Sequence, residues 1–531
     1  MVLNGPAACA LRGTIRRPLS WRALRPQSAS RAIPTAARLP LRNLSSTAVQ
    51  HNEDQRTWTT PLAKQLADAM MITGPVPLAS YMRMCLTGDI GGYYTGLTEK
   101  NRDQFGLKGD FVTSPEISQI FGELVGIWFV AEWMSQGKPK NVHLIELGPG
   151  RGTLMDDILR TLSNFKDLTQ SIETIYMVEA SATLRETQKK LLCGAQAQVT
   201  ESAVGHHSVS KHLGVPIIWA ESVKAIPHHP SSVPFMVAHE FFDALPIHAF
   251  QTVTVNQQPK TPTTTVPQPA SSEAAVEASP ATTKSETSNT DNTSTPTVEW
   301  RELVVSPVPP NSTHATLNTP QSQRDGPVPE FQLTQSTSPT HHARYVPESS
   351  PRYRALKTVA GATIEVCPDA TMFAADLATR IGGSSDHPKP RPSGAALILD
   401  YGTSDTVPIN SLRGIRRHRL VSPFTEPGLV DLSADVDFMA LADSATKASP
   451  GVEVHGPVEQ AAFLGQMGIR ERAEMLTKRP GMPQKRQDDI DRSWRRLVDR
   501  GPGGMGKVYK VLAILPENRG QRRPVGFGGD I

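Results

Sequence analysis

Short, uninterrupted apolar runs alternate along this chain with longer segments in which apolar residues recur at the spacing of one helical face. Each run predicts a buried strand, because a strand covered on both faces of its sheet reads as a continuous apolar stretch. Helices are predicted at 153–162 and 183–192. This alternation predicts an α/β fold with a mostly parallel, doubly wound sheet. The predicted strands are 142–147, 175–178, 216–219, 234–238, 395–399 and 508–515.

A further amphipathic helix is predicted ahead of the first of these strands. Ser114 and Pro115 have the residue types of an N-cap and a first helical position. The helix is expected to end near Gly137 and to pack one face against the sheet. The apolar residues of that face are Ile117, Ile120, Phe121, Leu124, Trp128 and Ala131.

The composition changes sharply after residue 256. Residues 257–296 are mainly Thr, Ser, Pro, Ala and Asn, so they cannot bury enough apolar surface to offset the entropy lost on ordering. A strand-like run at 298–305 follows, and a second low-complexity stretch covers 307–342. We therefore predict disordered loop insertions across 257–345, with one short strand among them.

The remaining folded patterning predicts one discontinuous domain, made of residues 53–256 and 346–515. Surface loops tolerate long insertions at modest cost, so an interrupted domain is physically reasonable. The insertion follows the strand at 234–238, and we expect it near the substrate side of the sheet. Residues 516–531 are rich in Gly and Arg and are expected to form a disordered tail.

The first 52 residues have the composition of a mitochondrial transit peptide. No Asp or Glu precedes Glu53, whereas arginines are frequent from Arg12 to Arg42 among many Ser and Ala residues. An Arg-rich, Ser-rich, acid-poor segment without an apolar core is typical of such a signal. The alternative is a basic disordered tail without a targeting role. We predict targeting to the mitochondrial matrix.

The overall composition narrows the range of partners. The formal net charge is only +4, and much of the basic excess lies at the N-terminus, so the charge does not indicate a nucleic-acid partner. The four cysteines lie far apart and form no Cys/His cluster, which argues against disulfides and a zinc site. No apolar stretch reaches the roughly 20 residues that span a bilayer, so no membrane insertion is expected. The oligomeric state cannot be predicted.

The segment 146–152 (ELGPGRG) follows a predicted strand and opens a predicted helix, which is the context of a nucleotide-type ligand site. Gly148, Gly150 and Gly152 allow a ligand close to the backbone, and the helix start adds free N–H groups. The glycine spacing differs from a dinucleotide fingerprint, and Glu146 suits the cationic amino group of S-adenosylmethionine (SAM). Glu179, after the second strand, suits a ribose diol. A NAD-type site and a purely structural tight turn are the alternatives.

The segment 239–246 (HEFFDALP) follows the strand at 234–238, and ligands of open α/β sheets bind at such strand ends. Glu240 and Asp243 could pair with a planar guanidinium group, on which the neighbouring phenylalanines could stack. His239 is a candidate general base or orienting residue. The alternative is a helix N-terminus whose acids interact with the helix dipole.

Other acids near the predicted cleft have weaker support. Tyr401, directly after Asp400, is a further candidate at the end of the strand at 395–399. Asp431, Asp435 and Asp437 could suggest a bound cation, but they lack the ligand spacing of a metal-binding loop. We expect them to shape the cleft or cap a helix, and we predict no metal.

Taken together, these segments resemble the MidA family of mitochondrial methyltransferases, and the resemblance spans most of the folded chain. The blocks at 109–116 and 239–246 are the most specific, since many methyltransferases share the glycine-rich motif. The chain departs from the family pattern in its long insertions, at Ser422 and at Glu459. The matching segments are 109–116 (GDFVTSPE), 121–124 (FGEL), 146–154 (ELGPGRGTL), 239–246 (HEFFDALP), 400–402 (DYG), 412–414 (LRG) and 431–438 (DLSADVDF), followed by Gly456 and Pro457 with Gln460, Phe463 and Leu464.

The resemblance implies a class I SAM-dependent methyltransferase fold and a matrix location. It further implies symmetric dimethylation of an arginine on a core peripheral-arm subunit of respiratory complex I during assembly. Two other functions remain open. One is a non-catalytic complex I assembly factor on a methyltransferase fold, because a fold does not guarantee activity. The other is a small-molecule or lipid methyltransferase, for which an apolar acceptor pocket would be expected.

Overall fold

The computed structural model describes residues 56–96, 106, 109–255 and 297–528. The predicted transit peptide and the low-complexity stretch 257–296 lie outside the described residues. The described residues belong to a unit that begins at Arg56. Among them, no helix has the length and apolar character needed to cross a membrane.

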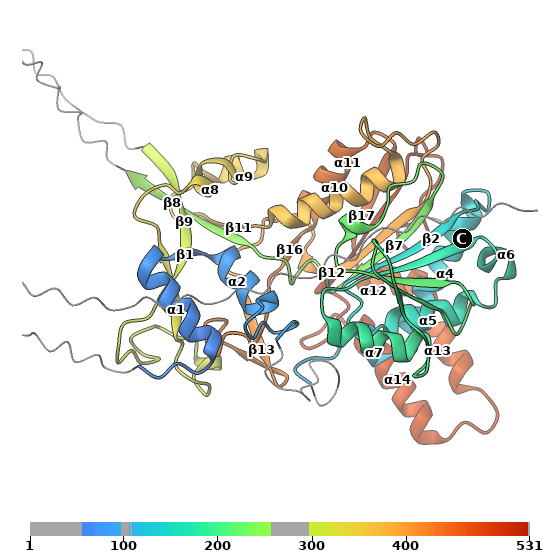
Figure 1. Cartoon of the computed structure of the whole chain (residues 1–531), viewed down its shortest axis with the longest axis horizontal. Helices are drawn as coiled ribbons and strands as arrows, with labels where there is room; N and C mark the ends of the chain where they lie inside the picture. Colours follow the sequence, from blue (N-terminus) through green and yellow to red (C-terminus); the bar gives the residue numbers. More distant parts are fainter. Residues whose placement is uncertain (1–55, 97–105, 107–108, 256–296, 529–531) are drawn as a thin grey trace, which may run out of the picture. The chain divides into compact units, whose positions relative to one another are not determined.

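The main sheet has the strand order β17-β18-β12-β7-β2-β3-β6-β5-β4. Of these strands, β17, β12, β7 and β2 are labelled in Figure 1. Its central strands, from β12 to β6, are parallel to one another. Antiparallel strands extend both edges, and β16 adds a short parallel pairing to β12. The bounds are β17 Val452–Glu459, β18 Tyr509–Pro516, β12 Ala395–Thr403, β7 Val233–His239, β2 Val142–Leu147, β3 Ile172–Val178, β6 Pro216–Ala220, β5 His206–Val209, β4 Thr200–Glu201 and β16 Val436–Asp437.

Helices cover both faces of this sheet, which explains why its central strands are apolar throughout. Successive residues of β2 point to opposite layers, so that Leu144 packs into one core and Ile145 into the other. The predicted strands and the doubly wound parallel sheet are confirmed. The first layer contains α4 Gln119–Ser135, α5 Thr153–Leu162, α7 Ala182–Leu192, α12 Gln460–Gln466, α13 Ile469–Thr477 and α14 Gln484–Val498, and the second contains α10 Pro368–Gly382 and α11 Phe438–Ala448.

A second, antiparallel sheet is built mainly from the chain that follows β7, with β1 added from the N-terminal part. We call it the accessory sheet; its strand order is β1-β9-β8-β11, and β10 also pairs with β9. A third small sheet has the order β14-β13-β15. The bounds are β1 Val76–Pro77, β8 His248–Val255, β9 Thr297–Pro307, β10 Phe331–Gln335, β11 Thr363–Val366, β13 Arg413–Arg416, β14 Arg419–Val421 and β15 Asp431–Ser433.

Short helices complete the described structure. Helices α1 and α2 pack with the accessory and third sheets around one apolar cluster that includes Tyr81 and Phe331. The bounds are α1 Pro61–Thr73, α2 Leu78–Thr87, α3 Ser114–Ile117, α6 Lys166–Thr169, α8 His341–Tyr345, α9 Pro351–Leu356, and the 3-10 turns η1 Val223–Ala225 and η2 Gln321–Gln323.

The helix predicted from Ser114 to Gly137 is two helices. Thr113, not Ser114, is the N-cap of α3, and it forms a capping box with Glu116. The backbone of Ser118 is extended and ends this first turn before α4 begins. The capping box is a local hydrogen-bond exchange that satisfies the free N–H groups of a short helix.

The prediction of disorder was wrong for residues 307–345. Strand β10 pairs with β9 along its whole length, and Phe331 is fully buried against Trp58 and Tyr81. The run predicted at 298–305 is confirmed as the longer strand β9. One aromatic anchor and a backbone ladder thus order a segment whose composition is mostly polar.

The tail was also predicted wrongly as far as residue 528. Its backbone carbonyl at Val525 accepts a hydrogen bond of 3.1 Å from the indole of Trp128. Phe527 packs on Phe463 with ring centroids 5.7 Å apart, and Arg522 pairs with the buried Glu132. These contacts cover the first helical layer and hold the tail in place.

Candidate active site

A cleft of about 420 Å³ lies at the carboxyl ends of the parallel strands. Its walls come from the segments after β2, β3, β6 and β7, and from α2, α3 and the start of α10. Both the volume and the position are those of a small-molecule site in an α/β sheet. The predicted residues Glu146, Gly148, Gly150, Glu179 and Glu240 all line it.

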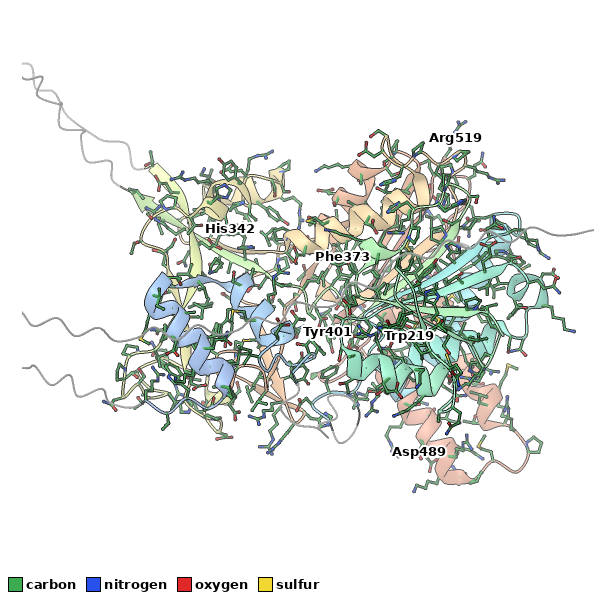
Figure 2. The ribbon with its side chains drawn as sticks, in the orientation of Figure 1. Trp219, His342, Phe373, Tyr401, Asp489 and Arg519 are labelled. Carbon is green, nitrogen blue, oxygen red and sulfur yellow. The ribbon has the colours of Figure 1, made fainter. Side chains whose placement is uncertain are left out.

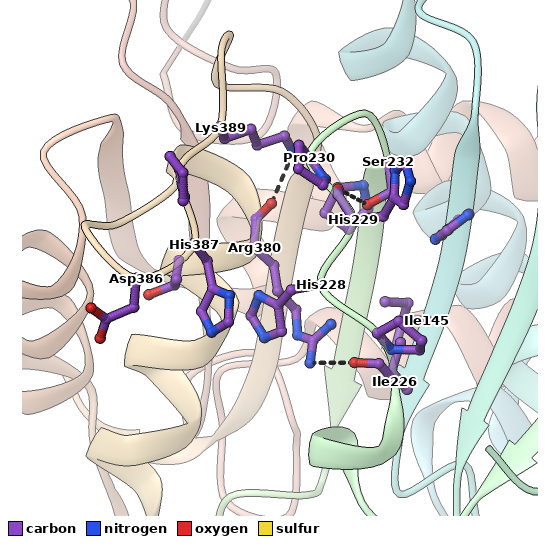
Figure 3. Close-up of a pocket in the computed structure, with 15 residues that line it drawn as sticks. Ile145, Ile226, His228, His229, Pro230, Ser232, Arg380, Asp386, His387 and Lys389 are labelled. Carbon is purple, nitrogen blue, oxygen red and sulfur yellow. Dashed lines mark hydrogen bonds between the residues drawn. The ribbon is translucent and has the colours of Figure 1, made fainter. Parts of the chain in front are cut away.

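A smaller pocket of about 170 Å³ lies at the opposite, amino ends of β2 and β7 (Figure 3). The rings of His228 and His387 stack there with centroids 4.2 Å apart. The Lys389 ammonium group donates to the carbonyls of Arg380 and Ser393, each at 2.9 Å, so it holds the surrounding loop. None of the predicted site residues lines this pocket, and its volume is below that of typical cofactor sites.

The glycine-rich turn adopts a backbone that other residues rarely accept. Gly148, Gly150 and Gly152 have φ values of 62°, 52° and 84°, in the left-handed region. A Cβ atom on Gly148 would come within 2.8 Å of the Phe241 ring. Helix α5 begins directly after the turn, and its N-cap Gly152 offers no side chain, so the first N–H groups remain available to a ligand.

Glu146 is a buried carboxyl group that faces the cleft with an unsatisfied oxygen. Its side chain lines the cleft, yet Oε2 has no hydrogen-bond partner among the described residues. Burial, together with the charge of Glu179, raises the pKa of Glu146 to about 8. A buried acid without a partner is costly, so this oxygen is suited to a cationic or N–H donor brought by a ligand. The site therefore fits the amino group of SAM.

Glu179 is placed at the end of β3 by two hydrogen bonds. Its Oε1 accepts from the backbone N–H of Ser181 at 2.8 Å, and its Oε2 accepts from Gln188 at 3.3 Å. Burial raises its pKa to about 7. A carboxylate has further acceptor positions, so Glu179 can still receive the hydroxyl groups of a ribose at the cleft wall.

Gln188 on α7 was not among the predicted residues. Its amide nitrogen donates to the carbonyl of Gly150 at 2.7 Å as well as to Glu179, and its Oε1 accepts from the indole of Trp219 at 2.9 Å. Trp219 lies on β6 (Figure 2). Gln188 is fully buried and so fixes the glycine-rich turn relative to the acid of the next strand. A lone glutamine on an otherwise ordinary helix gives no sequence signal for this role.

Glu240 begins the acidic motif after β7 in a left-handed backbone conformation, with φ of 49°. Its Oε1 accepts a hydrogen bond of 2.6 Å from the hydroxyl of Tyr509 on β18. Burial raises the pKa of Glu240 to about 8, with further contributions from the charges of Asp243 and Asp431. The described chain from 240 to 247 contains turns and no helix, which removes the helix N-terminus interpretation of this motif.

Asp243 does not join Glu240 on the cleft wall. The residue is buried, and the charge of Arg413 opposes the effect of burial, so that its pKa rises only to about 6. The backbone N–H groups of Phe241, Phe242 and Asp243 all point to Oδ2 of Asp400, at 3.1, 2.8 and 3.3 Å. Asp400 therefore fixes the backbone of the motif through these three hydrogen bonds, a role that the sequence did not reveal.

His239 is a poor candidate for a general base. Burial lowers its pKa to about 3, so the imidazole is neutral throughout the physiological range. Phe121 contacts it edge-on at 5.1 Å, and Tyr509 lies parallel to it at 6.3 Å. Its Nε2 has no hydrogen-bond partner among the described residues, although Glu240 lies 3.5 Å away. These contacts favour an orienting role.

Tyr401 and the three aspartates belong to the surroundings of the cleft. The ring of Tyr401 packs on that of Tyr509 at a tilt of 40°, with centroids 4.1 Å apart, and lies under the guanidinium of Arg413. Asp431 accepts from Tyr94, Asp435 pairs with Arg413, and Asp437 caps α11 and pairs with Arg352. The expected capping role of Asp437 is confirmed, and these three acids do not converge on one point that could hold a cation.

The parallel sheet, the glycine-rich turn and the acids at the ends of β2 and β3 define a class I SAM-dependent methyltransferase fold. A family model described as "Putative S-adenosyl-L-methionine-dependent methyltransferase" matches residues 124–458. The chain belongs to this family.

Relatives and a solved structure agree with this assignment. The chain is 35% identical to "Protein arginine methyltransferase NDUFAF7, mitochondrial" of Rattus norvegicus over 87% of this chain and 85% of that protein. It is also 35% identical to the Drosophila melanogaster homolog, over 86% of this chain and 85% of that protein. The crystal structure of a "likely methyl transferase" from Burkholderia thailandensis, bound to S-adenosyl-homocysteine, has a similar fold. Its TM-score is 0.58 at 20% identity, and the match covers 88% of this chain and 95% of that chain.

Proposed function

We propose that this protein is a mitochondrial matrix enzyme that transfers methyl groups from SAM to an arginine side chain of another protein. We further propose symmetric dimethylation, with a core peripheral-arm subunit of complex I as the substrate. The names of the relatives support the arginine and mitochondrial parts. The MidA-like blocks support symmetric dimethylation and the complex I substrate, and the acid-free N-terminus supports the matrix location.

Glu240 is the observation that carries the arginine assignment. It lines the same cleft as Glu146 and Glu179 and lies at the end of the strand next to β2. A buried carboxylate is costly unless a cation or several donors approach it, and a guanidinium group supplies both. The neighbouring Phe241 ring lines the cleft and offers an apolar face for a planar group.

The chain's own residues divide between the two reactants. Glu146 would accept the amino group of SAM, Glu179 the ribose hydroxyls, and Gly148 and Gly150 would leave room for it against the backbone. When bound, SAM supplies an electrophilic methyl group. Glu240 holds the guanidinium, and catalysis rests mainly on position and electrostatics.

Glu240 also provides a destination for the released proton. An N–CH₃ bond forms as the S–CH₃ bond breaks, and the alkylated nitrogen then loses one proton. In its ionised form Glu240 can accept that proton, and its pKa of about 8 makes it a stronger base than an ordinary carboxylate. His239, whose pKa is lowered to about 3, is a much weaker acceptor.

The test is transfer of labelled methyl from SAM to a complex I fraction from mitochondria that lack this protein. The chain from Ser45 onward and its Glu240→Gln variant are compared, and the labelled band is hydrolysed for amino-acid analysis. Symmetric dimethylarginine with the natural chain and a loss of at least 100-fold with the variant is the expected result. SAM binding without labelled protein would instead favour the assembly-factor or small-molecule function.

A further inference from the structure

The accessory sheet brings together three side chains that commonly bind metals. They are His248 on β8, Glu302 on β9 and His342 on α8, and one ligand atom from each lies within 4.8 Å of the other two. His342 is labelled in Figure 2. None of the three lines the active-site cleft. The cluster is thus separate from the methyl-transfer chemistry.

Strand register and a helix cap produce this convergence. Phe250 on β8 lies opposite Glu302 on β9, and His248 lies two residues from Phe250 on the same face of the sheet. Thr340 is the N-cap of α8, and its hydroxyl also donates to Oε2 of Glu302. That contact brings the first turn of α8, with His342, over the carboxylate.

The distances are close to those of a coordination sphere. His248 Nδ1 lies 2.7 Å from Glu302 Oε1, and His342 Nδ1 lies 3.5 Å from Glu302 Oε2. Tetrahedral Zn²⁺ with bonds of about 2.0–2.1 Å separates neighbouring ligand atoms by about 3.3 Å. To reach this spacing, His248 would move away from Glu302 by about 0.6 Å, and the wider separations in the cluster, which extend up to 4.8 Å, would contract.

The electrostatics also favour a cation. The Glu302 side chain is 0% exposed, and the buried residues Phe250 and Trp300 belong to the apolar cluster of this sheet. Within the described part of the chain, its ion-pair partners are the two histidines, which are charged only when protonated. A bound metal ion would place a permanent positive charge beside this buried carboxylate. The His342 side chain is 43% exposed, which leaves a path for an ion from solvent.

We propose that His248, Glu302 and His342 form a site for a divalent transition-metal ion of the Zn²⁺ type, with water as a further ligand. Two imidazoles and one carboxylate suit Zn²⁺ better than Ca²⁺ or Mg²⁺, which prefer oxygen ligands. The ion would tie α8 to the β8–β9 pair. The sequence analysis predicted no metal. It could not find this site, because His248, Glu302 and His342 lie too far apart in sequence to form a spacing motif.

The test uses the full chain after chelator treatment and titration with Co²⁺, whose visible absorption reports tetrahedral coordination, followed by displacement with Zn²⁺. One ion per chain is expected. His342→Ala removes a partly exposed ligand and should weaken binding at least tenfold. His341→Ala, its exposed neighbour, is the matched control and should bind like the natural chain.

A second measurement separates metal binding from misfolding. Zn²⁺ should raise the thermal midpoint of the natural chain and of His341→Ala, but not that of His342→Ala. SAM binding by all three proteins checks that each is folded. Absence of the Co²⁺ spectrum in the natural chain, or equal affinity in His342→Ala, would overturn the proposal and leave a hydrogen-bonded triad without an ion.

Discussion

The hydroxyl of Tyr509 donates a hydrogen bond of 2.6 Å to Oε1 of Glu240, although 269 positions separate the two residues in the chain. Tyr509 lies at the start of β18 and pairs in register with Tyr401 on β12. The last strand of the sheet therefore supplies a direct contact to the acid that we assign to arginine binding.

Removing that hydroxyl should change the pH dependence of methyl transfer. The hydrogen bond from Tyr509 favours the ionised form of Glu240 and so lowers its pKa, against the larger effect of burial. In Tyr509→Phe the pKa of Glu240 should rise further. We expect the acidic limb of the kcat/KM profile to shift upward by about one pH unit, with a loss of about tenfold at pH 7. A profile of unchanged shape would show that Tyr509 only fills space.

SAM affinity should increase with pH through the neutral range. The pKa of Glu146 is raised to about 8 in the free protein, and an amino group needs the ionised carboxylate, so binding releases a proton. We expect affinity to fall by up to about tenfold per pH unit from pH 8 to pH 6. Calorimetry in buffers of different ionisation enthalpy measures the proton release. Glu146→Gln should bind weakly and with a flatter pH dependence.

The raised pKa of Glu146 should make the free protein less stable as pH rises, whereas SAM binding becomes stronger. The free energy of unfolding is highest below pH 4.5, the pKa of Glu146 in the unfolded chain, and decreases as pH rises through about 8, its pKa in the folded protein. Glu146→Gln does not ionise, so without SAM it should be more stable than the natural chain at pH 8.5. Urea unfolding at pH 5.5 and 8.5 checks this, and a variant that is less stable at both values would contradict it.

A side chain at Gly150 should exclude SAM. Gly150→Val places a branched group at the cleft wall and should weaken SAM binding at least 100-fold. It also strains a left-handed backbone, which costs roughly 1–2 kcal/mol. Gly214→Val is the matched control, because Gly214 has φ of 69° and open space around it. The control should lose similar stability but keep its affinity; normal SAM binding by Gly150→Val would refute the site assignment.

The segment between β8 and β9 should be dispensable for methyl transfer. Val255 and Thr297 pair directly, and no residue of the β8–β9 ladder lines the cleft. Replacing residues 256–296 by Asn-Gly should keep activity and add roughly 2–3 kcal/mol through a shorter loop. Loss of transfer in a folded, SAM-binding variant would indicate that the segment contacts the substrate.

Local patterns predicted the parts of the site that lie within one strand and its following turn. The turn from Glu146 to Gly152 could be placed because an apolar strand, spaced glycines and a helix follow one another in sequence. The motif at Glu240 could be placed because it directly follows an apolar strand. Both lie at the carboxyl ends of adjacent parallel strands, which is why they meet.

Residues that act across the sheet could not be predicted in this way. Gln188 and Tyr509 reach the site from other elements, and no periodicity shows which residue a helix face or an edge strand presents to a distant turn. The proximity of Asp243 and Glu240 in sequence suggested that they act as a pair, but only Glu240 lines the cleft. Polar composition likewise concealed β10, whose order depends on Phe331 and a backbone ladder.

Among the described residues, β18 is the last strand in sequence, yet it lies inside the sheet between β17 and β12. During synthesis, the edges of β12 and β17 that pair with β18 therefore stay unpaired until residues 509–516 have been made. A product that stops short of this strand would lack Tyr509 and expose two open strand edges, a state prone to aggregation. The position of this one strand thus makes both a closed sheet and the contact to Glu240 depend on residues 509–516.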